Sequence, residues 1–333
     1  MDSGGNVYVT GTYYSYDLEL NLGFLRKLSP VGVVLWEVET PNPSNFQNTT
    51  ATAGEVVWES GGNVWWLFNC WGSSSHWAVM KLNGDTGAQA WTTEIDGAGF
   101  AADMTVSNTG NVYVSTGGID GGGGANAQLT ALSGAGDALW SKQPNQRGMC
   151  VVARSDGVIM VGGDNGAVWG YDTNGNALWT KYLFNGSDSI WGLAWDGAAW
   201  YAAGRESGLV AKVNGSDNDT VMWQKQIVVQ YSSWSTTWME YSSWDGHLYI
   251  TGVNQDQYEN RGFSTVKMTA NTGDLVWANN LTTSTPGQWY NWGHHDLTVY
   301  HDYYAVTGHA KPGGSSYNKQ ILAKLPTDGT LTG

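Results

Sequence analysis

A tryptophan recurs along this 333-residue chain at a fixed distance after a turn residue. Five copies place it four residues after a glycine: Gly32/Trp36, Gly87/Trp91, Gly136/Trp140, Gly175/Trp179 and Gly273/Trp277. A sixth copy has Asp219 in place of the glycine, ahead of Trp223. From the first tryptophan to the last there are five intervals over 241 residues, a mean of about 48 residues. Each copy reads as a β-hairpin, and this period fits a four-stranded sheet, so the repeat predicts a radial or stacked array of sheets.

A second strand pair precedes each hairpin, and its second member is a short run rich in β-branched and aromatic residues. The seven copies are Gly5–Gly11, Gly62–Phe68, Gly110–Thr116, Gly157–Gly163, Gly197–Ala203, Gly246–Gly252 and Asp302–Gly308. We therefore predict an all-β fold, a seven-bladed β-propeller of four-stranded antiparallel blades. The expected units are residues 1–40, 53–96, 99–144, 147–184, 188–230, 234–282 and 290–333.

The repeat is cut at both ends. The first unit lacks its first strand, and the last unit stops at Gly333, where the repeat tryptophan is due. We expect residues 1–333 to form a single propeller and to be a segment of a longer protein.

Charge excludes one class of partner. The formal net charge is −14, from 15 Lys and Arg against 29 Asp and Glu, so a phosphate backbone would be repelled. No apolar run is long enough for a membrane span, and the N-terminal residues have neither a basic nor an apolar signal region. We expect neither a nucleic-acid nor a membrane partner.

The hairpin Lys-Leu-x-x-x-Thr-Gly-x-x-x-Trp at Lys81 to Trp91, which recurs at Lys267 to Trp277 with Met268 in place of the leucine, resembles the repeat of PQQ-type (quinoprotein-like) bacterial propellers. That family includes dehydrogenases and propeller lipoproteins of outer-membrane assembly. The run from Ile321 to Gly333 is similar to sequence in virion or tail proteins of marine bacteriophages. These resemblances imply a virion-associated, extracellular or cell-surface setting, with other subunits of a virion or envelope assembly as partners.

Two differences from known enzyme propellers argue against catalysis by this chain. The resemblance to quinoproteins implies an adjacent Cys-Cys pair and a calcium-bearing cluster, but Cys70 and Cys150 are isolated. A sialidase-type propeller has its tryptophan three residues after the glycine of an Asp-x-Gly turn, and here the spacing is four. We predict a non-catalytic module with no cofactor; a quinoprotein-like or glycosidase-like enzyme is the less favoured alternative.

Spare aromatic residues gather in the loops on one face of the predicted blades. They include Tyr13, Tyr14 and Tyr16 in the first unit. The predicted contact surface is Trp71, His76, Trp77, Trp234, Trp238, Trp289, Tyr290 and Trp292. Aromatic rings among neutral polar groups suit a glycan or a protein receptor. Two alternatives remain open: a protein–protein scaffold or structural virion component, and loops that bury their own tryptophans.

One dense ionisable cluster, His294-His295-Asp296, begins the first strand of the last unit. Strand alternation sends the two histidines to opposite faces, so they cannot share one ion. Glu55, Asp103 and Glu240 hold similar strand positions in other units. A metal or catalytic role needs a third converging group, so we predict no metal site and no catalytic residue.

Overall fold

The computed structural model describes the chain except residues 18, 42–49, 72–75, 97–99, 118–127, 145, 187, 219, 228–232, 256–260, 282–295, 311–318 and 331–333. Its contacts group the chain into two compact units. The first contains Met1–Val161 and Gly170–Trp179, and the second contains Gly162–Trp169 and Thr180–Gly333.

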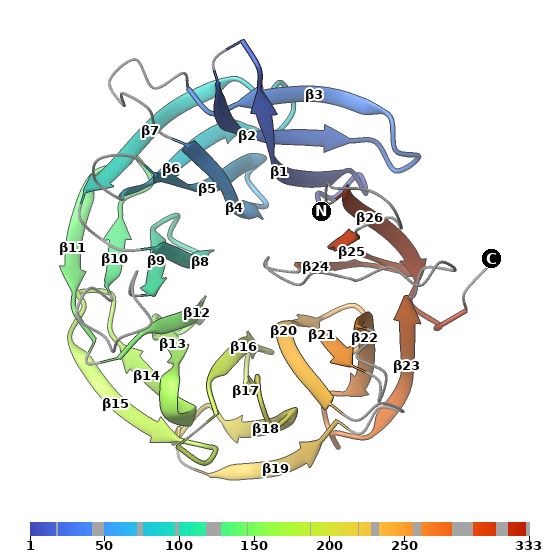
Figure 1. Ribbon diagram of the computed structural model, residues 1–333. Helices are drawn as coiled ribbons and strands as arrows, with labels where there is room; N and C mark the ends of the chain where they lie inside the picture. Colours follow the sequence, from blue (N-terminus) through green and yellow to red (C-terminus); the bar gives the residue numbers. More distant parts are fainter. Residues whose placement is uncertain are drawn as a thin grey trace. The chain divides into compact units, whose positions relative to one another are not determined.

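The described chain forms seven sheets whose strands neighbour one another in chain order. The first three sheets contain β1 (Val7–Ser15), β2 (Leu20–Leu28) and β3 (Val34–Glu39); β4 (Thr50–Trp58), β5 (Asn63–Trp71), β6 (His76–Asn83) and β7 (Gln89–Asp96); and β8 (Phe100–Val106), β9 (Val112–Gly117), β10 (Leu129–Leu132) and β11 (Ala138–Lys142). The fourth contains β12 (Gly148–Ala153), β13 (Ile159–Gly163), β14 (Ala167–Tyr171) and β15 (Ala177–Tyr182), with the single helical turn η1 (Asp164–Gly166) between β13 and β14. Figure 1 shows the first three sheets following one another within the first unit.

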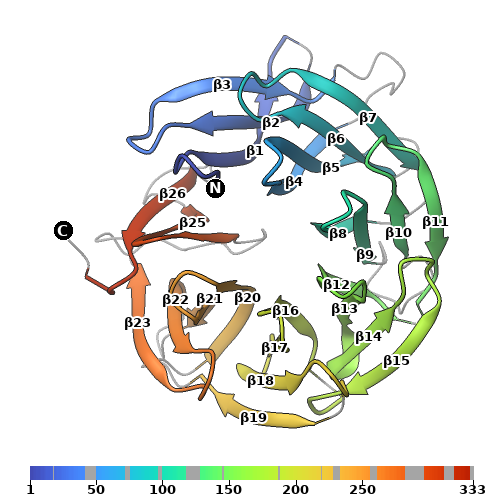
Figure 2. The same ribbon diagram turned by 180° about the vertical axis from the view of Figure 1, so that it is seen from behind.

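The last three sheets belong to the second unit, which Figure 2 shows from behind. They contain β16 (Ile190–Trp195), β17 (Ala199–Gly204), β18 (Leu209–Asn214) and β19 (Val221–Gln226); β20 (Ser233–Ser242), β21 (His247–Gln255), β22 (Arg261–Thr269) and β23 (Leu275–Leu281); and β24 (Leu297–Tyr300), β25 (Tyr303–Ala310) and β26 (Lys319–Pro326).

These sheets define a seven-bladed β-propeller and confirm the predicted fold class. The first and last sheets have three described strands each, and the other five have four. The first strands of neighbouring sheets pack together, β4 against β8 in the first unit and β20 against β16 and β24 in the second. That the whole chain is one domain stays a prediction.

Burial follows the position of a strand within its sheet. The second strands β9, β13 and β17 are buried along their whole length, because both of their faces are covered. The outer strands β3, β15 and β19 are largely exposed, and the repeat tryptophan is one of the few half-buried residues in each. The middle strands therefore form the core, and the outer strands contribute mainly their tryptophan.

The repeat tryptophan contacts the turn glycine of the following sheet. A Cβ placed on Gly87, whose φ is +71°, would lie 3.0 Å from Cδ2 of Trp36. The same relation joins Gly136 to Trp91 and Gly273 to Trp223. A side chain at these positions would be strained by the positive φ and would also clash with the indole. Both the backbone conformation and the lack of space therefore require glycine.

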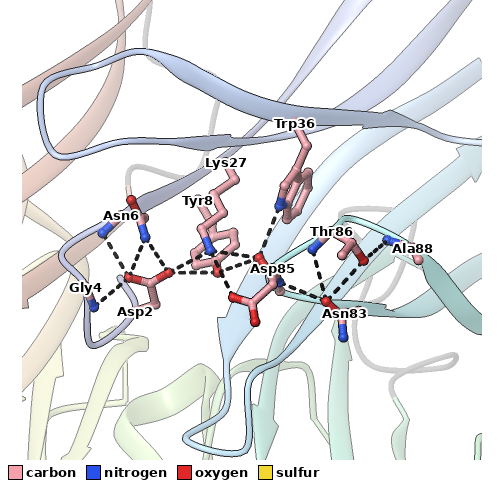
Figure 3. Close-up of polar contacts among 11 residues, drawn as sticks. Asp2, Gly4, Asn6, Tyr8, Lys27, Trp36, Asn83, Asp85, Thr86 and Ala88 are labelled. Carbon is pink, nitrogen blue, oxygen red and sulfur yellow. Dashed lines mark hydrogen bonds and ion pairs between the residues drawn. The ribbon is translucent and has the colours of Figure 1, made fainter.

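Beneath Trp36 lies a polar group that we call the clasp: an aspartate, a tyrosine, a lysine and the tryptophan, centred on one carbonyl of the next sheet. Figure 3 shows the first copy, in which Tyr8 Oη, Lys27 Nζ and Trp36 Nε1 donate hydrogen bonds to the Gly84 carbonyl at 3.3, 2.8 and 3.1 Å. Tyr8 Oη also lies 3.1 Å from Asp2, so its single proton is shared between the Asp2 carboxylate and the Gly84 carbonyl, and Asp2 lies 2.9 Å from Lys27 Nζ. Because donors from one sheet share an acceptor in the next, the clasp ties neighbouring sheets together.

The second unit contains an equivalent clasp. Asp245 lies 2.9 Å from Lys267 Nζ and accepts from Tyr249 Oη at 2.7 Å. Lys267 Nζ and Trp277 Nε1 both donate to the Thr327 carbonyl at 3.0 Å. The recurrence of this arrangement explains why the lysine and tryptophan positions of the repeat occur together.

Candidate functional site

Three exposed tyrosines lie at the end of the β1–β2 hairpin, in the first unit. The side chains of Tyr13, Tyr14 and Tyr16 are 36%, 48% and 81% exposed. The rings of Tyr14 and Tyr16 meet edge to face, with centroids 5.2 Å apart. We call these three residues the tyrosine surface.

The hairpin presents this surface because its strands are longer than the sheet needs. Pairing continues from Val7 opposite Leu28 to Ser15 opposite Leu20. Side chains near the end of the hairpin therefore leave the core and reach solvent. The exposed carboxylates of Asp17 and Glu19 lie in the adjoining turn, so the tyrosine surface is bordered by negative charge.

Polar and ring contacts fix Tyr13 to the rest of its sheet. Its hydroxyl donates a hydrogen bond to Glu39 of β3, and this bond raises the pKa of Tyr13 to about 12. Its ring lies 6.4 Å from that of Phe24, over which the guanidinium of Arg26 is placed at 4.5 Å. Contacts of this kind hold the side chain in place before any partner arrives, which lowers the entropic cost of binding.

The structure places two of the predicted contact residues in the core. Trp77 is fully buried among Trp65, Val79 and Met104, and His76 is 3% exposed. Both faces of β6 are covered by neighbouring sheets, so alternation does not bring either residue to the surface. The prediction that these two side chains form part of an exposed contact surface is therefore wrong.

The other predicted contact residues are partly or wholly outside the described part of the chain. Trp238 is half-buried and packs against Tyr249, Leu297 and Tyr304. The backbones of Trp71 and Trp234 lie at strand ends, but their side chains are outside the described residues. Trp289, Tyr290 and Trp292 fall in residues 282–295 and also lie outside them.

A second exposed aromatic group lies in two tight turns of the second unit. The ring of Trp244, which is 65% exposed, stacks on His301 with centroids 4.1 Å apart and planes 3° apart. His301 stacks in turn on Tyr300 at 4.2 Å, with a φ of +51° that residues other than glycine rarely adopt. One signal in the sequence could have revealed this group: a tryptophan stands directly before the Asp-Gly turn at Asp245.

Only some of the ionisable residues that the sequence suggests for metal binding or catalysis lie in the described part of the chain. His294 and His295 lie outside the described residues. Burial raises the pKa of Glu240 to about 8, with the carboxylate of Asp296 adding to the effect, and burial raises the pKa of Asp296 to about 6. Among the described residues, no three His, Cys, Asp or Glu side chains form a group able to hold a metal ion.

The two cysteines, Cys70 and Cys150, are buried thiols that are not joined in a disulfide. Burial raises the pKa of the Cys70 thiol to about 12, so it is protonated at neutral pH and a weak nucleophile. No described helix has the length and apolar character needed to cross a membrane.

Seven antiparallel sheets with a recurring Trp clasp define a β-propeller of the kind that the repeat predicts. Comparison with solved structures finds BamB from Moraxella catarrhalis, with a TM-score of 0.52 and 17% sequence identity, over 97% of this chain and 87% of that one. At this identity the similarity shows the fold alone, a β-propeller like that of a bacterial protein. The resemblance to bacteriophage tail proteins finds no support. No family model and no curated protein matches the sequence.

Proposed function

We propose that this protein is a non-catalytic binding module that recognises a protein partner through the tyrosine surface. The observation that carries the proposal is the exposure of Tyr13, Tyr14 and Tyr16 together on one hairpin, in a chain that fully buries aromatic residues such as Trp65, Trp66, Trp200 and Tyr201. Tyrosine offers a large rigid ring and a hydroxyl at low entropic cost, and it is enriched at protein interfaces.

Charge indicates the chemistry of the partner. Asp17 and Glu19 border the tyrosine surface, and the whole chain carries a formal charge of −14. A partner surface with arginine or lysine side chains fits this border, because opposite charges speed the encounter and orient it. The extracellular, virion-associated or cell-surface setting expected from the sequence stays a prediction.

Site-specific cross-linking tests the proposal. A photoreactive phenylalanine analogue replaces Tyr16, and the matched control carries it at Tyr182, which is 63% exposed on β15. We expect the variant with the analogue at position 16 to form a discrete cross-linked product with a partner protein, and the control with the analogue at position 182 to form none. The purified partner should then lose at least tenfold in affinity for the Tyr14→Ser/Tyr16→Ser variant and bind Tyr182→Ser as it binds the wild type. Equal cross-linking at both positions, or unchanged binding by the double variant, would refute the proposal.

Carbohydrate binding is the second candidate, and the stack of Trp244 on His301 favours it. An exposed indole face accepts the apolar face of a sugar ring, and the stack holds that indole rigid. A glycan array repeated with Trp244→Ala and with Trp292→Ala tests this candidate at one described and one undescribed position. An array with no binding above background would exclude this candidate, and signals that survive in both variants would show that neither tryptophan binds the glycan.

A further inference from the structure

Two carboxyl groups meet beside the loop that joins β17 to β18 in the second unit. Asp188, which is 3% exposed, lies in the connection between β15 and β16, and Glu206 lies in the β17–β18 loop. The amide of Glu206 donates to Asp188 Oδ1 at 2.8 Å, and the Glu206 carboxyl is within hydrogen-bonding reach of the Asp188 carboxyl. A hydrogen bond between two carboxyl groups needs one proton, because two carboxylates at this distance repel each other.

The surrounding donors hold Asp188 as the anion of the pair. Ser207 Oγ donates to Asp188 Oδ2, in addition to the bond from the Glu206 amide to Oδ1. Both donors stabilise the charged form of Asp188, so the shared proton belongs to Glu206. Partial burial and the hydrogen bond with Asp188 raise the pKa of Glu206 accordingly. A Cβ on Gly204 would collide with Oδ2, so glycine at this position is what lets the carboxylate approach the loop.

The carboxyl pair also joins backbone segments of the second unit. The Ser189 amide donates to Glu206 Oε2 at 2.9 Å, and the Arg205 amide donates to the Ser189 carbonyl at 2.8 Å. The Asp188 carbonyl accepts from the amide of Gly166 in η1. A protonated Glu206 thus fastens the β17–β18 loop to the β15–β16 connection, which is itself bound to η1.

The ends of the loop are held by bonds that do not titrate. The Arg205 carbonyl accepts from the uncharged Thr236 amide of β20 at 3.1 Å, and the Gly208 carbonyl accepts from the Ile227 amide at 2.9 Å. Neither bond involves a carboxyl group. Loss of the proton would therefore release residues 206–207 while β17 and β18 stay paired.

Other charged groups lie around Glu206. Arg205 Nε is 3.8 Å from Glu206 Oε1 and favours the ionised form, but partial burial and Asp188 outweigh it. From η1, Asp164 accepts from Ser189 Oγ at 3.4 Å and places a further carboxylate near the pair. Ionisation of Glu206 would thus add a negative charge beside two others, with one cation in reach.

We propose that Asp188 and Glu206 form a pH-operated latch, which holds residues 206–207 against the β15–β16 connection while the two share one proton and releases them when it is lost. The folded pKa of Glu206 lies above its ordinary value of 4.5, so the latch is closed in acid and opens as the pH rises through the folded pKa. The ionised side chain, already 49% exposed, then turns to water.

Opening of the latch changes the surface around it. Arg205 belongs to the same loop, and its guanidinium stacks over the ring of Trp191 at 4.1 Å. Release of Glu206 therefore alters both the charge and the shape of the surface beside Trp191. This device is independent of the tyrosine surface and can succeed or fail separately.

Hydrogen exchange of the full chain, measured by mass spectrometry and corrected for the intrinsic effect of pH, tests the latch. In the wild type we expect protection of the amides of residues 205–207 to fall at least about tenfold between pH 4.5 and about pH 8. The amide of Val210, inside β18, should keep its protection. Glu206→Gln can donate to Asp188 and accept from Ser189 at every pH, so its protection should change less than about threefold.

Ser207→Ala is the matched control in the same loop. It removes a donor to Asp188 that does not titrate, so protection should be lower at both pH values but should still fall as the pH rises. The wild type alone decides the proposal if a variant does not fold, because constant protection of residues 205–207 would overturn it. An equal fall in Glu206→Gln, or a fall that extends to Val210, would overturn it as well.

Discussion

The indole of Trp36 lies against Gly87, a turn glycine 51 residues further along the chain and in the next sheet, so that an added Cβ would come within 3.0 Å of Cδ2. The repeat pairs each tryptophan with the glycine four residues before it, but the structure pairs it in space with the glycine of the following unit. Each copy of the motif therefore takes part in two successive interfaces. Its tryptophan contacts the glycine of the next sheet, and its glycine contacts the tryptophan of the preceding sheet. Its spacing persists because each hairpin must offer a tryptophan to one neighbour and a glycine to the other.

Substitution at Gly87 should test this relation directly. Gly87→Ala forces a Cβ onto Trp36 and onto a backbone with φ of +71°, and we expect a loss of about 2–3 kcal/mol in the free energy of unfolding. Gly32→Ala is the matched control: its φ is +85° at the same turn position, but nothing lies within 4 Å of the added Cβ. It should lose only about 1 kcal/mol. Urea denaturation measures both, and equal losses would show that the indole contact contributes nothing.

Removal of the clasp lysine should be costly where the lysine is buried. Lys27→Met and Lys267→Met each leave a partly or wholly buried aspartate without its cation, and we expect each to lose about 3 kcal/mol of unfolding free energy. Lys324→Met is the control at the same repeat position, because this lysine is exposed. It should stay within about 1 kcal/mol of the wild type. A loss at Lys324 equal to the other two would argue that the repeat position matters for reasons other than burial.

Asp2 should make stability fall in acid. Burial opposes its ionisation, but hydrogen bonds from Asn6 and Lys27 outweigh this and lower its pKa from 3.8 to about 2. Because the folded pKa lies below the unfolded one, the stabilisation is present above about pH 4 and is lost as the pH falls from there towards 2. Its size is about 2 kcal/mol. Urea denaturation between pH 2 and pH 6 should show a shallower pH dependence for Asp2→Asn than for the wild type, and parallel curves would contradict the assignment.

Glu240 should have the opposite effect. Burial and the carboxylate of Asp296 raise its pKa from 4.5 to about 8, so its folded pKa lies above the unfolded one. The contribution is therefore favourable at low pH and is lost as the pH rises from about 4.5 to 8. Glu240→Gln should be more stable than the wild type at pH 8 by on the order of 2 kcal/mol and close to it at pH 4.5. A variant less stable than the wild type at pH 8 would indicate that Glu240 is held ionised.

Alanine substitutions at Trp77 and Tyr16 should distinguish an aromatic residue of the core from one at the surface. Trp77→Ala empties a fully buried site and should cost about 3–5 kcal/mol. Tyr16→Ala removes a side chain that is 81% exposed and should change stability by less than about 0.5 kcal/mol. Thermal denaturation of the two variants measures the contrast, and a large loss for Tyr16→Ala would mean that the tyrosine surface has a structural role.

Much of the fold was predictable because it depends on local, repeated features. Alternating strands and Gly turns at a regular spacing fix the four-stranded unit, and counting the copies of Gly5–Gly11 and its equivalents fixes seven blades. The role of the tryptophans as fillers between blades was also predictable, since a large ring on an exposed outer strand needs a neighbour to cover it.

The candidate site was less predictable, because exposure depends on what the neighbouring sheets cover. His76 and Trp77 adjoin a loop and were expected at the surface, but sheets on both sides of β6 bury them. Tyr14 and Tyr16 were recognised as spare aromatics, and only the length of the β1–β2 hairpin reveals that they stand clear of the core.

The amino-acid sequence alone determined the repeating strand unit, the number of its copies and the acidic character of the surface, because these follow from local spacing and composition. Tertiary structure alone decided which tryptophan meets which glycine and which aromatic rings reach water. The physical reason is that burial is a property of pairs of sheets, and residues that form one interface lie about 50 positions apart in the chain.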